Sequence, residues 1–383
     1  MAITLVSSPR KYCPANYTVA WEFSLDNLGT PPTRIDFGFA LYDESGIRLT
    51  EDESYKPQAI DTNFKREFAA IVSDIVYTSF PAESASSQID TNILKKIRIK
   101  YGPVDFNSET CESFKSIDTE SSLIYLVSAN VNTQTQAVWG TSSGFSSPRT
   151  GLMLHQRPDK WQLLHGSKDY IWLLGAGQVV LTYYNGASVI GSAIVYNLTG
   201  ADTVKYICLD YLVHGISTKP THATVFVSDG VNEKSHRIDY CCCVKQDDYL
   251  GILFLEPFGG RSMLATGIGQ SYSVDRTASV VNKSFDLSQT THKSGGNSIY
   301  IPKGSLKLTF KTQIEASAGF ETMLKNFLSS PGHHAQKGYG GNLKWEKFIL
   351  EPGSEIIKEK NKLIDFSFSG YISESINTQR QDI

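Results

Sequence analysis

The sequence predicts a mainly β protein with a few short helices, built from tandem β-sandwich-like domains. First, Thr, Val, Ile and aromatic residues, including 19 Tyr and 19 Phe, recur in short runs separated by Gly, Ser, Asn and Asp. Residues of the first group favour strands and those of the second favour turns. Second, several runs alternate apolar with polar residues, as strands with one buried face do. Third, Asn185-Gly186 and Asp229-Gly230 stand between strand-like arms and suit hairpin turns.

The length and a shift in composition predict three domains. A chain of 383 residues is long enough for two or three domains. A stretch rich in Ser, Thr and Gly ends near residue 150, and short strands at hairpin spacing follow it. We therefore expect a β-rich domain with one short helix at 1–150, a β-sandwich-like middle domain at 151–245, and a β-rich domain with one amphipathic helix at 246–383.

In the first of these domains the pattern predicts a hairpin within 18–47, whose strands are joined by a Gly-Thr-Pro-Pro turn. Apolar residues at helical spacing predict a short amphipathic helix within 64–79. The segment ILKKIRIKYG predicts a strand with one apolar and one cationic face. We expect this cationic face to contact solvent, in preference to forming a ligand-binding stripe. Its residues are Lys96, Arg98 and Lys100.

In the last domain the segment GFETMLKNFLSSP gives the clearest helix pattern, ended by Pro331. Alternation predicts strands around Leu306, Leu308 and Phe310 and in the segment KLIDFSFSGYISES. The apolar face of the helix consists of Phe320, Met323, Leu324, Phe327 and Leu328.

Cysteine and histidine positions predict no metal or cofactor site. Three of the six cysteines are consecutive, Cys241 to Cys243, and neighbours on a strand point to opposite faces, which favours reduced, buried thiols. His333 and His334 are the only adjacent histidines, and we expect them in an exposed loop because no other ligand stands at metal-site spacing.

Motifs and charge point away from several classes of function. The sequence contains no G-x-S-x-G and no H-E-x-x-H motif, although a triad of distant residues stays open. The formal charge of -3, with no polybasic run, does not indicate nucleic acid as a partner. No window reaches the ~18 apolar residues of a membrane-spanning helix. We therefore expect a soluble, non-enzymatic protein without a membrane span.

The segment from Tyr240 to Tyr272 combines the cysteines, an apolar run and a glycine-rich turn. Gly259 and Gly260 free the backbone to turn where a Cβ atom would clash. We interpret this pair as a junction turn between the middle and last domains.

With this order of elements the chain resembles virion tail proteins of phages that infect Bacteroidota, the crAss-like phages among them. The likeness lies in the strand-rich first domain, the hairpin-rich middle, the segment LGILFLEPFGG, and the helix followed by closing strands. The relatives have a Trp-Leu-Asn type sequence before the Gly-Gly turn, where this chain has Phe254-Leu255-Glu256.

The resemblance implies a structural subunit of a tail or neck, repeated in a ring. Its partners would be copies of itself and other virion tail or neck proteins. It would be made in the host bacterial cytoplasm, would end in the virion, and would need no cofactor. We hypothesise that the strand at 267–281 and a loop at 294–301 contribute to subunit contacts. The residues concerned are Gly267, Tyr272, Val281, Ser294 and Ile301.

A carbohydrate- or receptor-binding β-sandwich is the alternative, because aromatic rings on a sandwich surface can stack on sugars. Trp172, Tyr183 and Tyr184 are the candidate platform, although packing in the core also explains their positions. A hydrolase is the third hypothesis, and only the distant triad supports it.

Overall fold

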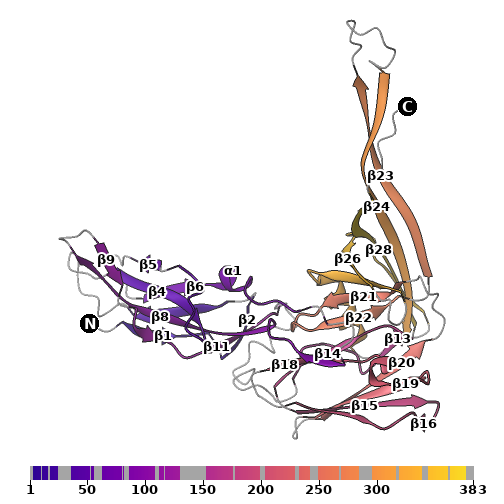
Figure 1. The fold of residues 1–383 in the computed structure, drawn as a ribbon, viewed down its shortest axis with the longest axis horizontal. Helices are drawn as coiled ribbons and strands as arrows, with labels where there is room; N and C mark the ends of the chain where they lie inside the picture. The colour runs from indigo at the N-terminus through magenta and orange to yellow at the C-terminus, as the bar shows by residue number, and fades with distance from the viewer. Residues whose placement is uncertain are drawn as a thin grey trace.

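The structure is a computed structural model. It describes residues 3–9, 11–15, 18–24, 36–51, 53–55, 63–79, 81, 86–107, 112–115, 117–129, 152–175, 177–198, 203–228, 233–241, 249–266, 269–283, 296–315, 319–338, 344–360 and 363–376. The chain is mainly β, as the sequence predicts, and the strands within these described residues form five sheets. Figure 1 shows an N-terminal part that projects to one side of a body, and a long hairpin that rises from that body.

Two sheets form the N-terminal part. A three-stranded sheet has the order β1-β3-β6, and a seven-stranded sheet has the order β2-β11-β8-β4-β5, with β9 and β10 also paired to β8. Aromatic and aliphatic side chains from both sheets share one core. The strands are β1 (Thr4–Ser7), β2 (Tyr12–Pro14), β3 (Ala20–Ser24), β4 (Asp36–Asp43), β5 (Glu53–Tyr55), β6 (Asn63–Glu67), β8 (Leu94–Asn107), β9 (Glu112–Lys115), β10 (Thr119–Glu120) and β11 (Ile124–Val127).

The predicted hairpin within 18–47 is wrong. β3 and β4 belong to different sheets, and they meet face to face through the Phe23 and Phe37 rings, whose centroids are 4.8 Å apart. Phe37, Phe39 and Leu41, which alternate along β4, are buried, but alternation carries no information about which strand lies alongside. The connecting residues, 25–35, are outside the described segments.

The predicted helix within 64–79 is largely wrong as well. The segment begins in β6 and forms only a short helix, α1 (Ala69–Val72). Phe68 and Val72 are buried as the predicted stripe requires, but Ile71 is 39% exposed. β6 pairs with β3 along its whole length and ends at Glu67, so the first residues of the segment are in a sheet and the helix that follows has only four residues.

The middle part is a sandwich of two sheets. Four strands have the order β12-β14-β18-β7, and six have the order β13-β20-β19-β15-β16 with β17 paired to β15. Ile171 and Leu173 of one sheet share a core with Val179 and Val225 of the other. The strands are β7 (Ser87–Ile89), β12 (Leu152–Met153), β13 (Lys160–Leu164), β14 (Tyr170–Leu174), β15 (Gly177–Asn185), β16 (Ser188–Val189), β17 (Ile194–Leu198), β18 (Val204–Cys208), β19 (His222–Ser228) and β20 (Glu233–Cys241), with the 3-10 helix η1 (Tyr211–His214).

The Asn185-Gly186 hairpin turn is confirmed. Asn185 pairs with Ser188 across the turn, and Gly186 adopts φ +60°. The second predicted turn, Asp229-Gly230, lies outside the described residues, although β19 and β20 on either side of it pair antiparallel.

The C-terminal part is an eight-stranded sheet whose order is β22-β21-β25-β26-β28-β24-β23, with β27 paired to β28. The predicted helix is confirmed as α3 (Phe320–Ser329), and Phe327 packs on Phe254 and Phe368 of the sheet. The strands are β21 (Tyr249–Leu255), β22 (Arg261–Ala265), β23 (Gly269–Lys283), β24 (Gly296–Glu315), β25 (His333–Lys337), β26 (Lys344–Leu350), β27 (Ile356–Lys360) and β28 (Leu363–Ile376).

Strand pairing and packing cross the predicted domain boundaries. β7, from the range 1–150, pairs with β18 of the middle part. Leu253 and Met263, from the range 246–383, lie in the middle core, and Phe258 packs in a cluster with Val127 and Trp172. The three parts are therefore held together by shared cores.

Candidate interaction arm and its buried base

β23 and β24 form a long hairpin that leaves the body of the protein (Figure 1). They pair from Gly269 with Lys311 at the inner end to Lys283 with Gly296 at the outer end. β28 supports β24 only from residue 315 to Gly304. Within the described residues, the outer segments 277–283 and 296–303 therefore form a ribbon of two strands. We call the β23–β24 hairpin the arm.

The inner half of the arm is fixed to the body. Lys307 Nζ lies 2.8 Å from Glu351 Oε2, and the hydroxyls of Thr309 and Ser369 are 2.8 Å apart. Phe310 is fully buried. Its ring packs on Tyr249, Phe348 and Phe368. The contrast with the outer half is clear, because an isolated two-stranded hairpin is marginally stable at best in water.

The two edge strands of the eight-stranded sheet, β22 and β23, have different surroundings. At one end β22 contacts β13 and β14 of the middle sandwich, and Ser262, Met263 and Leu264 are buried there. At the other end β23 pairs with β24 alone among the strands that the structure describes. An open edge presents unpaired backbone N–H and C=O groups to which another chain can add a strand.

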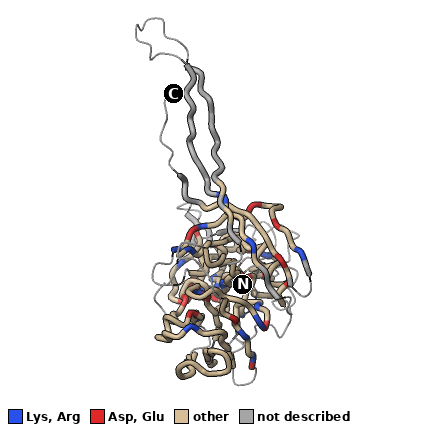
Figure 2. The backbone as a smooth tube through the Cα atoms, turned by 90° about the vertical axis from the view of Figure 1, so that its right-hand side faces the viewer, with Lys and Arg blue, Asp and Glu red and all other residues tan. Residues whose placement is uncertain are grey.

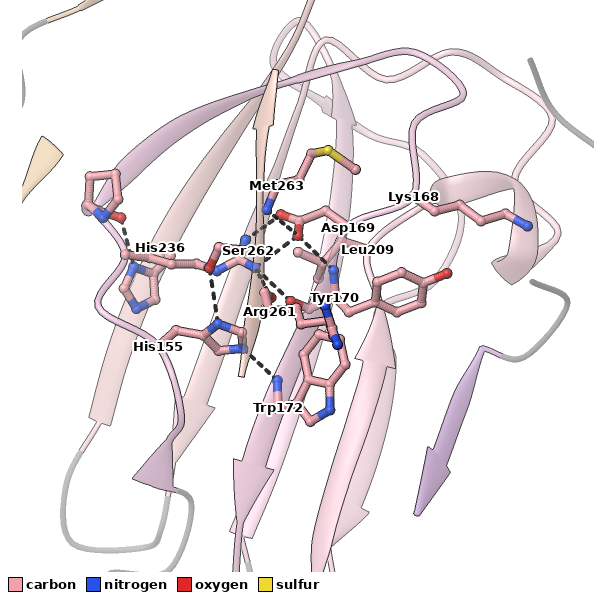
Figure 3. A network of polar contacts seen from close by, with 12 residues as sticks. His155, Lys168, Asp169, Tyr170, Trp172, Leu209, His236, Arg261, Ser262 and Met263 are labelled. Atoms are coloured by element: carbon pink, nitrogen blue, oxygen red, sulfur yellow. Dashed lines mark hydrogen bonds and ion pairs between the residues drawn. The ribbon is translucent and has the colours of Figure 1, made fainter. Parts of the chain in front are cut away.

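A buried polar network lies where β22 meets the middle sandwich (Figure 3). Arg157 and Asp169 form a bidentate ion pair, with Nη2 of Arg157 2.8 Å from Oδ1 of Asp169. Oδ1 also accepts from the backbone N–H groups of Tyr170 and Met263, at 2.8 and 3.2 Å. Nη2 of Arg157 donates to the carbonyl of Arg261 at 3.2 Å. The pair therefore ties the middle sandwich to β22.

The same network reaches the N-terminal part through Arg261. Its guanidinium donates to the carbonyl of Thr78 at 3.0 Å, and the Thr78 hydroxyl donates to the carbonyl of Gly259. Burial lowers the pKa of Arg261 to about 10. Arg261, which lies in β22 of the C-terminal sheet, therefore links that sheet to the backbone of the N-terminal part.

Gly259 and Gly260 lie in the turn between β21 and β22, against both other parts of the chain. A Cβ atom on Gly260 would sit 2.4 Å from the Leu154 carbonyl oxygen, and Gly259 adopts φ +98° beside Ser128. The sequence suggested a turn between the middle and last domains. The structure shows N-terminal residues in contact with it as well.

His155 and Ser262 are the only close Ser–His side-chain pair in Figure 3, with Nδ1 of His155 3.1 Å from Oγ of Ser262. Nε2 of His155 accepts a hydrogen bond from the backbone N–H of Trp172 at 2.7 Å. Burial lowers the pKa of His155 well below its usual value, with Arg157 and His236 acting in the same direction. In a catalytic triad the second ring nitrogen donates to a carboxylate. Here it accepts from backbone and both side chains are buried, which suits a structural role.

The sequence offered no signal for this network. Its contacts join residues that are far apart in the chain, 107 positions for His155 and Ser262 and 183 for Thr78 and Arg261, and no short motif joins them. A cluster of Arg, Asp and His in contact arises only when β14 and β22 come side by side, so only the fold could reveal it.

The prediction of exposed loop histidines is wrong. His333 begins β25, is 6% exposed, and its Nε2 donates to the Phe327 carbonyl at 2.7 Å. His334 is half-buried, and burial lowers its pKa to about 4. The sequence does not reveal this burial, because it arises where α3 packs on β25 and the Phe327 ring contacts His333. No group of three or more His, Cys, Asp or Glu residues in the described segments could hold a metal ion.

Two of the three aromatic residues of the carbohydrate alternative are inaccessible. Trp172 is fully buried and Tyr183 is 2% exposed, with its hydroxyl donating to the Leu209 carbonyl at 3.1 Å. Tyr184 is half-buried and stacks on His222, with centroids 4.6 Å apart. Packing in the core, the other explanation for these residues, holds for Trp172 and Tyr183.

Other predicted side chains also find structural partners. Lys96 pairs with Glu44, and Arg98 and Lys100 pair with Glu120. Cys13 and Cys208 are buried and Cys241 is half-buried, whereas Cys111, Cys242 and Cys243 lie outside the described segments. Figure 2 shows acidic and basic residues interspersed over the body.

The residues proposed for subunit contacts fall on or beside the arm. Tyr272 and Val281 lie in β23 and Ile301 lies in β24. Gly267 and Ser294 lie outside the described residues. The loop predicted at 294–301 is wrong from residue 296 onward, because β24 begins at Gly296.

Comparisons with known proteins give no family. No protein-family model and no curated protein matches the sequence. Among solved structures, the chain is similar to extracellular domains 3–5 of Drosophila OTK, with 10% identity over 80% of this chain and 92% of that chain, at a TM-score of 0.24. The N-terminal four Ig domains of Dscam1 isoform 7.44 match with 10% identity over 80% of this chain and 68% of that one, at 0.16. Among the described helices, none has the length and apolar character to cross a membrane.

Proposed function

We propose that the chain is a non-enzymatic structural subunit of a bacteriophage tail or neck assembly, and that copies of it join through the arm. The phage origin comes from the resemblance of the sequence. The single observation that supports a role in assembly is the outer arm, where two strands extend beyond the last residue pair supported by β28.

The energetics of the arm favour a partner. A two-stranded ribbon gains too little from burial to offset the conformational entropy of its residues. Strand addition from another molecule supplies backbone hydrogen bonds and buried side chains to such an element. In a ring, one patch of each copy meets a different patch on its neighbour, and a projecting arm reaches across such a contact.

The rest of the described chain serves as a rigid mount for the arm. The shared cores and the buried Arg157–Asp169 pair hold the parts together. The Ser262–His155 pair, which a hydrolase hypothesis would use, is closed to substrate.

The test is an arm-shortened variant in which residues 277–303 are replaced by an Asn-Gly turn. Arg276 and Gly304 are already paired across the hairpin, so the replacement leaves the supported sheet intact. Native mass spectrometry and negative-stain imaging at micromolar concentration should show oligomers or rings for the full chain and monomers for the variant, at unchanged melting temperature. Val189→Ser, on exposed β16, is the control and should assemble normally.

Two results would overturn the proposal. A full chain that stays monomeric in every condition would rule out assembly from copies. A shortened variant that assembles as well as the full chain would remove the arm from the interface.

A further inference from the structure

A buried side-chain pair, Glu256 and Asn326, joins the turn between β21 and β22 to α3. Nδ2 of Asn326 donates to Oε2 of Glu256 at 2.8 Å and to Oε1 of Gln156 at 3.0 Å. Both hydrogens of the amide group are therefore used. Glu256 is 1% exposed and Asn326 is fully buried, so the pair lies where a polar atom depends on protein partners.

One oxygen of each group has no donor. Within the described residues, no N–H or O–H forms a hydrogen bond with Oε1 of Glu256 or with Oδ1 of Asn326. A buried acceptor in this position has lost its hydration and gained no bond in return. An ionised carboxyl can only accept, whereas a protonated one also donates through its O–H. A proton on Oε1 of Glu256 supplies the donor that both oxygens lack.

The groups around the carboxyl do not compensate a negative charge. Burial raises the pKa of Glu256 to about 7, although Ser262, Arg157, Asn326 and the backbone of Gln156 act in the opposite direction.

The other ionisable groups nearby have partners of their own or lie in solvent. Arg157 is held by its ion pair with Asp169, and His155 contacts Ser262. The charged side chains of α3, Glu321 and Lys325, are exposed. The carboxyl of Glu256 therefore has no counter-ion of its own among the described residues.

A second polar contact holds the same end of α3. The backbone N–H of Leu255 donates to Oγ of Ser330 at 3.0 Å. Between the two contacts, the ring of Phe327 packs on Phe254 and Phe368. The C-terminal half of α3 is thus attached to residues 254–256, and a change at Glu256 alters how firmly α3 is held.

We propose that Glu256 is a neutral carboxylic acid in the folded protein and donates from Oε1 to Oδ1 of Asn326, and that loss of this proton to solvent loosens α3 from the turn. In the protonated form the carboxyl and the amide are joined by two hydrogen bonds, one in each direction. Ionisation removes one of these bonds and leaves two buried oxygens that both carry negative charge. The inference does not depend on the proposed function, since it needs neither a second copy nor a phage origin.

Hydrogen exchange of the α3 backbone amides measures how often the helix opens. It is followed by mass spectrometry from pH 5 to 8 and corrected for the effect of pH on the chemical rate. Opening exposes the carboxyl, whose pKa then falls from about 7 to 4.5, so protection in the original chain should drop roughly tenfold between pH 6 and 8 and level off above about pH 7.

Two variants isolate the proton. In Glu256→Gln an amide N–H donates to Asn326 without titrating, so protection of α3 should stay constant over this range. Glu233→Gln removes an exposed carboxyl and retains Glu256, so it should show the drop of the original chain. Infrared difference spectra between the original chain and the Glu256 variant should contain the C=O band of a protonated carboxyl at pH 6 and lose it at pH 8.

The proposal stands if the drop and the infrared band both depend on Glu256. It is overturned if protection of α3 in the original chain is independent of pH, if Glu256→Gln shows the same drop, or if the band is missing at pH 6. It is also overturned if α3 at pH 8 is as well protected as the buried strand β14, because α3 would then open only with the whole protein. Should the Glu256 variant fail to fold, exchange in the original chain alone still decides between these outcomes.

Discussion

Gly259 lies against the backbone of Ser128, so that a Cβ atom on Gly259 would sit 2.1 Å from the Ser128 carbonyl oxygen. This contact joins the β21–β22 turn of the C-terminal sheet to the N-terminal part of the chain. It is closer than any Cβ contact that real proteins tolerate, so backbone must move if a side chain is added.

Gly259→Ala should therefore destabilise the protein strongly. The clash and the left-handed backbone act together, and we expect a loss of about 3 kcal/mol or more in the free energy of unfolding. Gly46→Ala is the matched control, because Gly46 has φ +82° and nothing within 4 Å of the added atom. It should cost only about 1–2 kcal/mol. Urea unfolding measures both, and equal losses would show that the contact with Ser128 does not matter.

Asp169→Asn should cost about 3–5 kcal/mol, because it leaves the buried Arg157 guanidinium without its anionic partner. The matched control is Asp159→Asn, which removes an exposed pair with Lys234 whose atoms are 3.8 Å apart. Exposed pairs of this kind contribute about 0–1 kcal/mol. Thermal and urea unfolding would separate the two variants, and similar small losses for both would contradict a structural role for the buried pair.

Glu256→Gln should change how stability depends on pH. Burial raises the pKa of Glu256 from 4.5 to about 7, and its Oε2 accepts from Asn326 Nδ2 at 2.8 Å. Below pH 4.5 the carboxyl is protonated in both states and costs nothing. Between 4.5 and about 7 the unfolded state ionises first, so stability falls as pH rises, and above 7 the loss levels off.

A glutamine cannot ionise, so the variant should lack this fall and gain up to about 3 kcal/mol over the original chain between pH 4.5 and 8. Urea unfolding at pH 4.5, 6 and 8 provides the measurement. Glu233→Gln, which removes a carboxyl at an exposed position, is the control variant. A constant difference between the Glu256 variant and the original chain at all three pH values would show that folding does not shift the pKa of this carboxyl.

Trp172→Ala should destabilise the fold strongly, so loss of ligand binding in this variant would not by itself identify a binding residue. The side chain is fully buried, and its Nε1 donates to Asp90 Oδ2 at 3.3 Å. Large-to-small changes of this kind cost about 3–5 kcal/mol. Tyr184→Ala, at a half-buried position, should cost less. A stable Trp172 variant that has lost saturable binding on a glycan array would instead revive the carbohydrate hypothesis.

The sequence predicts much of the local structure and little of the pairing. Alternation located β8 and β28, a continuous apolar run located β21, and helical spacing located α3 almost to the residue. It failed at 64–79, where the residues up to Glu67 pair with β3 and only Ala69–Val72 form a helix. It failed again at His333, because sequence gives no sign that α3 folds back over β25.

The candidate site divides in the same way. Sequence placed Tyr272 and Val281 in a strand, because strand character is local, but it placed Ile301 in a loop where the structure has β24. It could not show that β22 is covered by the middle sandwich, or that β23 pairs with β24 alone among the strands that the structure describes. Those facts depend on which strands become neighbours.

By itself, the sequence determined the fold class, the apolar faces of the main strands and the flexibility at Gly259 and Gly260, since each follows from the chemistry of neighbouring residues. The tertiary structure alone decided which sheets pack together, where Arg157 meets Asp169 and which edge strand has a single neighbour among the described residues. Contacts between residues far apart in the chain depend on loop closure and on competition among many partners of similar hydrophobicity, and no local pattern records their outcome.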